Sequence, residues 1–392
     1  MKVTRIESLH CDAGWRNFSF LKVSTDSGIV GWSEYNASYG AVGLAAAIDA
    51  LGRRVVGKNP LAGEAIVAEL YAVTRQAAGG VVQEAIGAIE NALLDVKGKA
   101  LNVPVHVLLG GPVRDRLRLY WSHCGTTRIG NAAHCGVKPL KNLKDVARLG
   151  REVRERGFTA LKTNLLILDR KDPHLHMPGF YRGGPDAPAL NADPGLIRSI
   201  RATLEAFREG AGADVGILLD LNYNFKTEGY LQVTRALDDL GLFWFEIDTY
   251  DPQALAYMRR SVRTPIASCE SLHGLRAFLP YFEHRAMDVC IIDEVWNGVA
   301  LAQKVAAVAD AYEINVAPHN FYGHLSTLHS AHLCAALPNF RIMEIDVDDV
   351  PWKDDLVTPV PKIEDGHLLL PTGPGWGAEV NEAAVRKHPP RS

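Results

Sequence analysis

In the second half of the chain, short apolar runs repeatedly end at an acidic residue. Residues 217–219, 242–245 and 265–269 lead directly into Asp220, Glu246 and Glu270. A short, almost wholly apolar run predicts a strand buried on both faces, as in a parallel sheet covered by helices. The steps from 220 to 246 and from 246 to 270 are each about the length of one strand, one helix and two loops. The pattern therefore predicts consecutive parallel strands with an acid at each carboxyl end.

Eight such runs follow one another from residue 117 onward. They lie at 119–121, 160–163, 217–220, 242–246, 266–270, 289–293, 314–317 and 342–344. Helical patterns separate them, for example at 196–208 and 300–312. Repeated strand–helix units in this number predict an α/β fold, a (β/α)7-8 TIM-type barrel. A doubly wound open sheet is the alternative, but it needs a phosphate-binding glycine loop, and neither known pattern follows a predicted strand.

The N-terminal part has a different pattern. Polar and apolar residues alternate, as they do in strands, over residues 3–7, 20–25 and 29–34. This pattern predicts a small antiparallel sheet interrupted by a loop at 10–17. That loop and residues 36–40 are candidate ligand contacts. Residues 83–97 place an apolar stripe on one face of a helix. We therefore expect an α+β domain over residues 1–115, joined by a C-terminal return at 366–392, and a barrel domain over 116–365.

One segment interrupts the strand–helix alternation. Residues 165–193 follow the second predicted barrel strand and are rich in Pro, Gly and Asp. A loop of this length inside a compact domain is usually a lid or a binding loop. We expect it to lie over the barrel mouth and to be partly mobile without ligand.

Composition narrows the class of protein. Apolar residues make up 47% of the 392 residues and charged residues 22%, as in ordinary soluble enzymes. The net charge of −3 favours neither a nucleic-acid partner nor an anionic membrane. No signal pattern or membrane-length apolar run is visible, so we predict a cytoplasmic protein. The six cysteines lack Cys-x-x-Cys spacing and are expected to be reduced core residues.

The three strand-end acids predict a metal site. The carboxyl ends of parallel strands meet at one edge of a barrel, where active sites are built, so Asp220, Glu246 and Glu270 should converge. Without a cation the three would repel one another and raise one another's pKa. Hard oxygen ligands suit Mg²⁺. Each acid alone is as well explained as a surface or capping carboxylate, whereas three at near-equal spacing favour the cation.

A second set of residues offers acid–base chemistry. Asp293 and His319 end consecutive predicted strands, and a carboxylate on one imidazole nitrogen raises the basicity of the other. The alternative is a structural histidine beside a helix start. Glu344, after the eighth strand, is either a protonated donor to a substrate oxyanion or a simple salt-bridge partner. Lys162, in the second strand, points either into the mouth, where it would bind an acid substrate, or outward.

Together these residues resemble the enolase superfamily, mandelate racemase subgroup, over nearly the whole chain. The motifs are Lys162-Thr163-Asn164, Asp220-Leu221-Asn222, Glu246, Glu270, Asp293, His319-Asn320 and Glu344. Residues 24–34 and 92–100 resemble the α+β capping domain of that family, and residues 108–111 its crossover into the barrel. The combination is specific, although no single motif is.

The resemblance implies a Mg²⁺-assisted removal of the proton α to a substrate carboxylate. By position Asp220, Glu246 and Glu270 match the metal ligands, His319 with Asp293 the base dyad, and Glu344 the oxyanion partner. The same comparison implies a catalytic site that includes Lys162, and a set of substrate-binding asparagines. These are Asn164, Asn222 and Asn320. We also expect a homo-oligomer, from a dimer to an octamer.

Two positions depart from the family pattern. The second lysine of the usual Lys-x-Lys, a base on the opposite face, is replaced by Asn164. Some acid-sugar dehydratases of this family, such as rhamnonate dehydratase, also work without that lysine. The fourth strand reads Phe245-Glu246-Ile247-Asp248 where Glu-Glu-Pro or Glu-Asp-Pro is common. We therefore predict a sugar-acid dehydratase. The alternatives are a racemase, epimerase or cycloisomerase on the same fold, or a barrel that only binds an acid.

Overall fold

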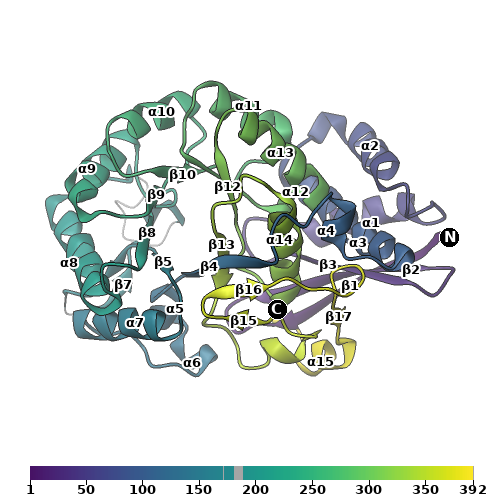
Figure 1. Ribbon diagram of the computed structural model, residues 1–392, viewed down its shortest axis with the longest axis horizontal. Coiled ribbons are helices and arrows are strands. Elements are labelled where there is room, and N and C mark those ends of the chain that lie inside the picture. Colours follow the sequence, from purple (N-terminus) through teal and green to yellow (C-terminus); the bar gives the residue numbers. More distant parts are fainter. Residues whose placement is uncertain (171, 181–188, 392) are drawn as a thin grey trace.

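A three-stranded antiparallel sheet begins the chain (Figure 1). The computed structural model describes residues 1–170, 172–180 and 189–391. The strands are β1 (Val3–Asp12), β2 (Asn17–Thr25) and β3 (Val30–Tyr35). The predicted loop at 10–17 is wrong in extent, because the pairing of β1 with β2 continues to Asp12 opposite Asn17 and leaves only residues 13–16 as a turn.

Helices pack on this sheet to form the N-terminal α+β part. They are α1 (Leu44–Val55), α2 (Gly63–Val73), α3 (Gly80–Leu101) and α4 (Val105–Leu108), with a 3-10 turn at Arg75–Ala77. Ile86, Ile89, Leu93 and Val96, the predicted stripe of α3, are all buried in the core of this part. Close approach requires Gly31 on β3, because a Cβ there would lie 2.3 Å from the Ala92 carbonyl oxygen of α3.

Eight parallel strands lie where the apolar runs predict them. They are β4 (Arg116–Ser122), β5 (Ala160–Thr163), β8 (Gly216–Asp220), β9 (Trp244–Glu246), β10 (Ile266–Ser268), β11 (Val289–Ile292), β12 (Asn315–Pro318) and β13 (Met343–Asp346). They pair in the order β13-β4-β5-β8-β9-β10-β11-β12. Between β12 and β13 a parallel bridge joins Val316 to Phe340, and Arg341 N donates to Val316 O. The predicted α/β barrel class is confirmed.

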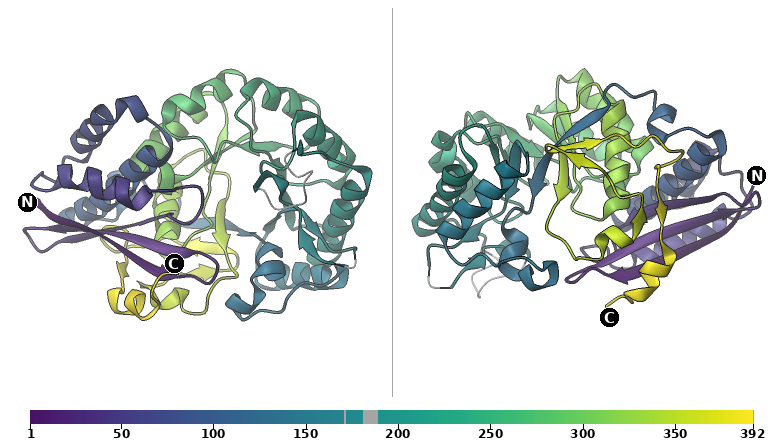
Figure 2. Two further views of the ribbon diagram at one scale, coloured as in Figure 1. Left: turned by 180° about the vertical axis from the view of Figure 1, so that it is seen from behind. Right: turned by 60° about the horizontal axis from the view of Figure 1, so that its bottom comes forward.

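Helices connect the strands and cover the outside of the barrel, as Figures 1 and 2 show. They are α5 (Thr126–Gly130), α6 (Ala132–Cys135), α7 (Leu143–Glu155), α8 (Pro194–Ala211), α9 (Thr227–Leu237), α10 (Pro252–Arg260), α11 (Leu275–Glu283), α12 (Glu294–Asn297), α13 (Val299–Ala311) and α14 (His324–Ala336). Short 3-10 turns lie at Pro178–Phe180, Asp238–Leu240 and Lys353–Asp355. Four of these helices begin at a side-chain cap. Asn142 accepts from Asp145 N, Asp193 from Leu196 N, Asp251 from Ala254 N and Asp293 from Trp296 N.

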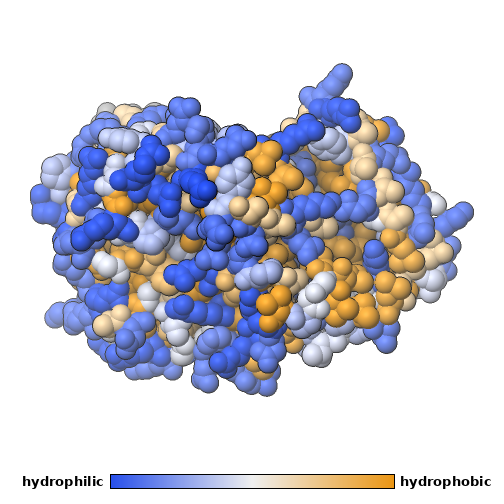
Figure 3. Space-filling model, turned by 45° about the horizontal axis from the view of Figure 1, so that its top comes forward, coloured by the Kyte–Doolittle hydropathy of each residue, from blue (hydrophilic) through white to orange (hydrophobic). Residues whose placement is uncertain are grey.

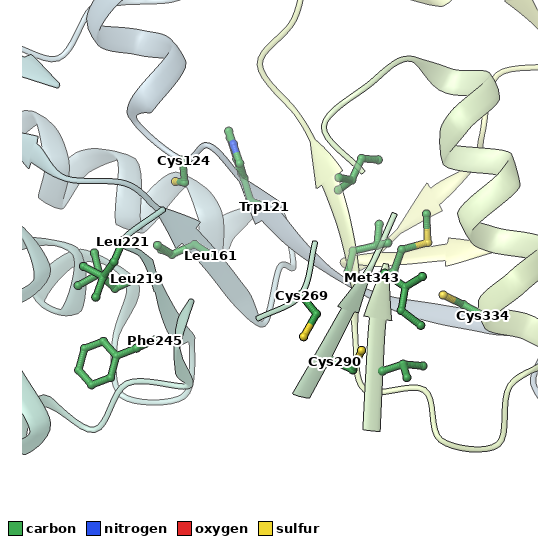
Figure 4. Close-up of a cluster of buried hydrophobic side chains, with 14 of the residues drawn as sticks. Trp121, Cys124, Leu161, Leu219, Leu221, Phe245, Cys269, Cys290, Cys334 and Met343 are labelled. Atoms are coloured by element: carbon green, nitrogen blue, oxygen red, sulfur yellow. The ribbon is translucent and has the colours of Figure 1, made fainter. Parts of the chain in front are cut away.

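Side chains alternate along the barrel strands between two buried layers. The interior layer takes residues from every strand or its immediate start: Tyr120, Ala160, Leu218, Trp244, Ala267, Val289, Ile291, Ala317 and Ile342. Their neighbours in sequence lie instead in the layer beneath the helices, part of which Figure 4 shows: Trp121, Leu161, Leu219, Phe245, Cys290 and Met343. Since alternate residues of a strand share a face, a residue two positions beyond the interior layer faces the mouth of the barrel.

The structure describes the insertion at 165–193 apart from residues 171 and 181–188. Strands β6 (Leu166–Ile167) and β7 (His174–Leu175) form a short antiparallel pair. Further along, Gly179 N donates to Asn224 Oδ1 at 3.1 Å, and the Phe180 ring packs edge-on against Tyr223. Because Tyr223 and Asn224 follow the carboxyl end of β8, this described part lies on the side of the barrel mouth.

The C-terminal residues run from the barrel back to the N-terminal sheet. Strand β16 (His367–Leu369) pairs with β4 and with β15 (Ile363–Glu364), β17 (Glu379–Val380) pairs with β14 (Val357–Thr358), and α15 (Glu382–Lys387) contacts β1. Asp95 of α3 accepts from Trp32 N and Trp376 N, at 2.8 and 2.9 Å, and pairs with Lys99. One buried carboxylate thus joins β3, α3 and the C-terminal return. The predicted domain boundaries stay a prediction.

All six cysteines are buried and free, as predicted. No helix in the described part of the chain combines the length and apolar character needed to cross a membrane. On the surface, apolar residues are interspersed among polar ones, with more of them over the half of Figure 3 that carries the N-terminal part. Exposed apolar residues of the N-terminal part include Val42, Val56, Val73 and Leu101.

Glu90 of α3 gives the fold a testable pH dependence. Its carboxyl group is buried at the start of α13, where backbone N–H groups of Ala300 and Leu301 bond to it, while Oε2 has no partner. Burial raises its pKa from 4.5 to about 7. Because folding raises the pKa of this acid, its contribution to stability is full below pH 4.5 and is lost as the pH rises through about 7.

We therefore expect Glu90→Gln to be more stable than the parent chain at about pH 8, by up to about 3 kcal/mol, and nearly equal to it at low pH. Urea unfolding of both proteins at about pH 5 and about pH 8 measures this difference. If the free energy of unfolding changes with pH equally in the two proteins, burial does not raise the pKa of Glu90 and the prediction fails.

Candidate active site

The predicted site residues lie one layer above the apolar interior of the barrel. Lys162, Asp220, Glu246 and Glu344 each follow an interior residue by two positions and share its face, and all four are buried. Asp220 and Glu246 are direct register partners on β8 and β9. Asp293 and His319 follow Ile291 and Ala317 in the same way. Strand alternation alone therefore gathers these six side chains at the carboxyl ends of the strands.

Lys162 points into the barrel mouth, one of its two predicted orientations. Its Nζ lies 2.9 Å from Glu246 Oε1, 2.9 Å from Glu344 Oε1 and 3.8 Å from Asp220 Oδ2. Burial lowers the pKa of Lys162, but Glu246 and Glu344 outweigh it and hold the pKa well above its ordinary value. The side chain is therefore a fixed positive charge at the centre of the site.

Glu344 is held as a carboxylate. It accepts from Lys162, from Ser122 Oγ and from Asn320 N, the last at 2.7 Å. Burial raises its pKa, but Lys162 and His319 lower it further, to about 2. Of the two predicted states, the ion-paired one is found here and the protonated donor is not.

Glu270 reaches the mouth by a different route from the other acids. Strand alternation from Ala267 would direct Cys269 inward and Glu270 outward. Cys269 instead has a φ of +94°, in the left-handed region, and its side chain lies in the layer beneath the helices (Figure 4). Glu270 Oε2 is then 3.6 Å from His319 Nε2. One strained residue thus reverses the alternation and turns Glu270 into the site.

This strain predicts opposite effects of two substitutions at Cys269. Glycine accepts a positive φ without cost, so Cys269→Gly should keep Mg²⁺ affinity near that of the parent chain. A β-branched side chain is poorly tolerated at that φ, so Cys269→Val should misplace Glu270 and weaken Mg²⁺ binding. Calorimetric titration with MgCl₂ tests both. If the valine variant binds Mg²⁺ as tightly as the glycine variant, the backbone at Cys269 does not control Glu270.

His319 and Asp293 form the predicted pair. His319 Nδ1 donates to Asp293 Oδ2 at 2.6 Å, which leaves Nε2 on the side of Glu270. Burial lowers the pKa of His319, but Glu270 and Asp293 outweigh it, so that the pKa lies well above its ordinary value. Rings of Trp296, Phe321 and Tyr322 surround the imidazole at centroid distances of 5.4, 5.0 and 5.8 Å. The imidazole is thereby fixed in tautomer and in orientation.

The three predicted asparagines differ in how much of the amide is free. Asn164 Nδ2 donates to Asp220 Oδ2 and Asn222 Oδ1, and its Oδ1 accepts from Thr126 Oγ1. The amide of Asn320 is likewise fully bonded, to Ser326, Thr327 and the Glu344 carbonyl. Of these three asparagines, only Asn222 has an amide nitrogen with no partner among the described residues. Asn222 is therefore the one placed to bond a ligand, and Asn320 instead supports Glu344.

The acidic residues match a divalent cation in chemistry. Burial raises the pKa of Asp220, Glu246 and Glu270, against the lowering effect of nearby Lys162 or His319. In the described part of the chain no three His, Cys, Asp or Glu side chains are already close enough to hold a metal ion. The positive charge among Asp220, Glu246 and Glu344 here is the Lys162 ammonium. Buried, hard oxygen donors that repel one another fit Mg²⁺.

Three residues of the site were missed by sequence reasoning. Tyr322 donates to Asp293 Oδ2 at 2.5 Å, so this oxygen accepts two hydrogen bonds. His123, directly after β4, has a φ of +45° and bonds through Nδ1 to Asp346 Oδ1 at 2.9 Å. Asp248 lies two positions beyond Glu246 and is buried. Strand alternation could have identified Asp248, whereas no local signal marks the other two.

The fold and site define an α/β-barrel protein with an N-terminal α+β part and an acid-rich site at the barrel mouth. The family described as "Enolase C-terminal domain-like" matches residues 145–384, and "Mandelate racemase / muconate lactonizing enzyme, N-terminal domain" matches residues 11–110. The chain therefore belongs to the mandelate racemase/muconate lactonizing enzyme family of the enolase superfamily, whose members bind Mg²⁺.

Similar proteins span the whole chain. The D-xylonate dehydratase of Haloferax volcanii is 28% identical and covers 99% of this chain and 89% of its own length. The D-galactonate dehydratase of Variovorax paradoxus is 28% identical over 98% of this chain and 94% of its own. A Burkholderia xenovorans protein, provisionally assigned as an L-alanine-DL-glutamate epimerase, is 53% identical with a TM-score of 0.98 and covers 100% and 99% of the two chains. A second structure of it, with magnesium and fumarate bound, has a TM-score of 0.97 and covers 100% and 96%.

Proposed function

We propose that this chain is a Mg²⁺-dependent hydro-lyase that dehydrates a sugar acid to a 2-keto-3-deoxy sugar acid. The observation that carries the proposal is the His319 imidazole, bonded to Asp293 through Nδ1 and with Nε2 3.6 Å from Glu270 Oε2. A base held in one tautomer beside a carboxylate-rich cation site is what removal of an α-proton requires. Relatives named as sugar-acid dehydratases support the class of substrate.

The cation is assigned to the strand-end acids Asp220, Glu246 and Glu270, whose oxygen chemistry and burial fit it. When bound, Mg²⁺ supplies positive charge that stabilises the negative charge developing on the substrate carboxylate as the α-proton leaves. Lys162 adds a second, fixed positive charge beside Asp220 and Glu246. The substrate carboxylate is expected to bind between these charges, near the free amide nitrogen of Asn222.

His319 carries the proton in this scheme. Its Nε2 takes the proton from the α-carbon, and the imidazolium then gives that proton to the departing β-hydroxyl, which leaves as water. The remaining enol becomes the 2-keto group. Asp293 stabilises the imidazolium between the two steps through the 2.6 Å hydrogen bond. One dyad thus serves as base and then as acid on the same face of the substrate.

Asn164 favours dehydration over an epimerisation that needs two bases. It occupies the position of the usual second lysine, cannot take up a proton, and has its amide fully bonded. Epimerisation nevertheless remains the second candidate, because His123 with Asp346 forms another imidazole–carboxylate pair at the mouth. The similarity to the provisionally assigned epimerase of Burkholderia xenovorans points to the same candidate.

Incubation with a panel of sugar acids and Mg²⁺ in deuterated water tests the proposal. A 2-keto product supports dehydration. Deuterium at the α-carbon without loss of water supports epimerisation. If a panel acid binds and neither product nor exchange is seen, the protein only binds acids and the proposal fails.

A further inference from the structure

Asp248 continues the face of β9 that carries Glu246. Trp244 lies in the barrel interior and Glu246 in the site, and Asp248 is the next residue of that series. Its backbone is fixed, because Asp248 N donates to Asn222 O at 3.4 Å and its carbonyl accepts from Tyr230 OH at 3.2 Å. The residue is 4% exposed. Asp248 therefore belongs to the wall of the site between β8 and β10.

Each basic side chain of the site is engaged with other acids. Lys162 contacts Glu246, Glu344 and Asp220, and His319 contacts Asp293 and Glu270. Among the described residues, Asp248 takes part in no ion pair. Its carboxyl group is instead within hydrogen-bonding reach of Glu270, with Asp220 and Glu246 as the next charged neighbours. All three neighbours are acids.

One oxygen of this carboxyl group, Oδ2, is buried and has no hydrogen-bond partner. An unpaired buried carboxylate is costly, and a cation bound beside it would remove that cost. A group that satisfies Asp248 must be positively charged, must reach the acids around it, and must accept oxygen donors. A divalent cation has all three properties.

We propose that Asp248 is a fourth carboxylate of the cation site, which holds the divalent cation together with Asp220, Glu246 and Glu270. The inference rests on the proposed function, since it adds to the cation site named there. With Asp248 the site gains negative charge and should bind Mg²⁺ more tightly than the three-acid set alone.

Calorimetric titration with MgCl₂ compares the parent chain with Asp248→Asn, which keeps the shape of the side chain and removes its charge. We expect Mg²⁺ binding to weaken by at least about tenfold, the scale reported for a lost supporting group at a metal site. Glu90→Gln is the control, because it also neutralises a buried carboxylate with an unpaired oxygen, but in α3. The control should bind Mg²⁺ like the parent chain.

Thermal unfolding separates a cation ligand from a structural residue. In excess chelator, Asp248→Asn should melt at a higher temperature than the parent chain, because an unpaired buried charge has been removed. In excess Mg²⁺ the order should reverse, because the parent chain gains more from the bound cation. A purely structural Asp248 predicts a lower melting temperature for the variant in both conditions.

Equal Mg²⁺ affinity of Asp248→Asn and the parent chain overturns the inference and leaves the three-acid cation site standing. A variant that melts lower than the parent chain in chelator also overturns it. If the parent chain itself binds no Mg²⁺, the inference and the proposed function fail together.

Discussion

Replacing His319 with asparagine is expected to slow exchange of the substrate α-proton with deuterated water by at least about 10²–10⁴-fold. Asparagine fills similar space but cannot take up a proton. The structure leaves no second titratable group in the position of Asn164, and His319 acts in both steps of the proposed dehydration. Loss of water should therefore fall by as much as proton exchange, or more. Mass spectrometry of a turned-over sugar acid follows both rates.

His284→Asn is the matched control, since His284 is exposed at the end of α11, and it should exchange and dehydrate at the parental rate. Asp293→Asn should leave substrate affinity nearly intact and slow both steps, because the amide misdirects the imidazole tautomer. If His319→Asn exchanges the α-proton at the parental rate, another group is the base. His123 and Lys162 are then the first residues to replace.

Glu270→Gln is expected to abolish turnover and to weaken Mg²⁺ binding by more than the roughly 10–100-fold typical of a lost supporting residue. The substitution removes one of three negative charges from the proposed cation site. It also removes the carboxylate 3.6 Å from His319 Nε2. Isothermal titration with MgCl₂ measures the first effect, and turnover with excess Mg²⁺ measures the second.

Glu382→Gln serves as the control, because Glu382 lies on α15 and pairs with Lys22 of β2, so the substitution should change neither quantity. Chelation of the parent chain should stop turnover, and added Mg²⁺ should restore it. Full turnover after exhaustive chelation would refute the cation requirement as a whole.

Much of this site follows from strand periodicity. The apolar runs locate all eight barrel strands. Asp220, Glu246, Asp293 and His319 share a face because each lies two positions beyond a residue of the barrel interior. Asp248 obeys the same rule, because it lies two positions beyond Glu246. The face of a residue near a strand end is thus predictable from sequence when the backbone stays extended.

Glu270 shows where periodicity fails. Alternation from Ala267 directs it away from the site, and only the left-handed conformation of Cys269 brings it back. Nothing about a cysteine signals a positive φ, so the prediction for Glu270 rests on the resemblance and the spacing rather than on its face of the strand. His123 and Asn222, beside the site, also have a positive φ, and there too the sequence gives no sign of the backbone conformation.

The remaining features of the site depend on contacts between residues far apart in the sequence. Arg16, from the turn between β1 and β2, is buried and pairs with Asp349, beyond β13, at 2.8 Å. Glu34 of β3 accepts from Ser326 N at the start of α14. Such contacts join residues about 300 positions apart, and a single sequence carries no pattern for them. The same holds for Asn320, whose fully bonded amide depends on which neighbours the fold supplies.

The carboxylate of Asp95 also governs the order in which the chain can mature during synthesis. Its partner Trp376 lies 281 residues further along. At about 5–20 residues per second, a ribosome needs roughly 15 to 60 s to make that interval. Asp95 therefore gains its last backbone partner only when the C-terminal return has been made, after all the barrel strands.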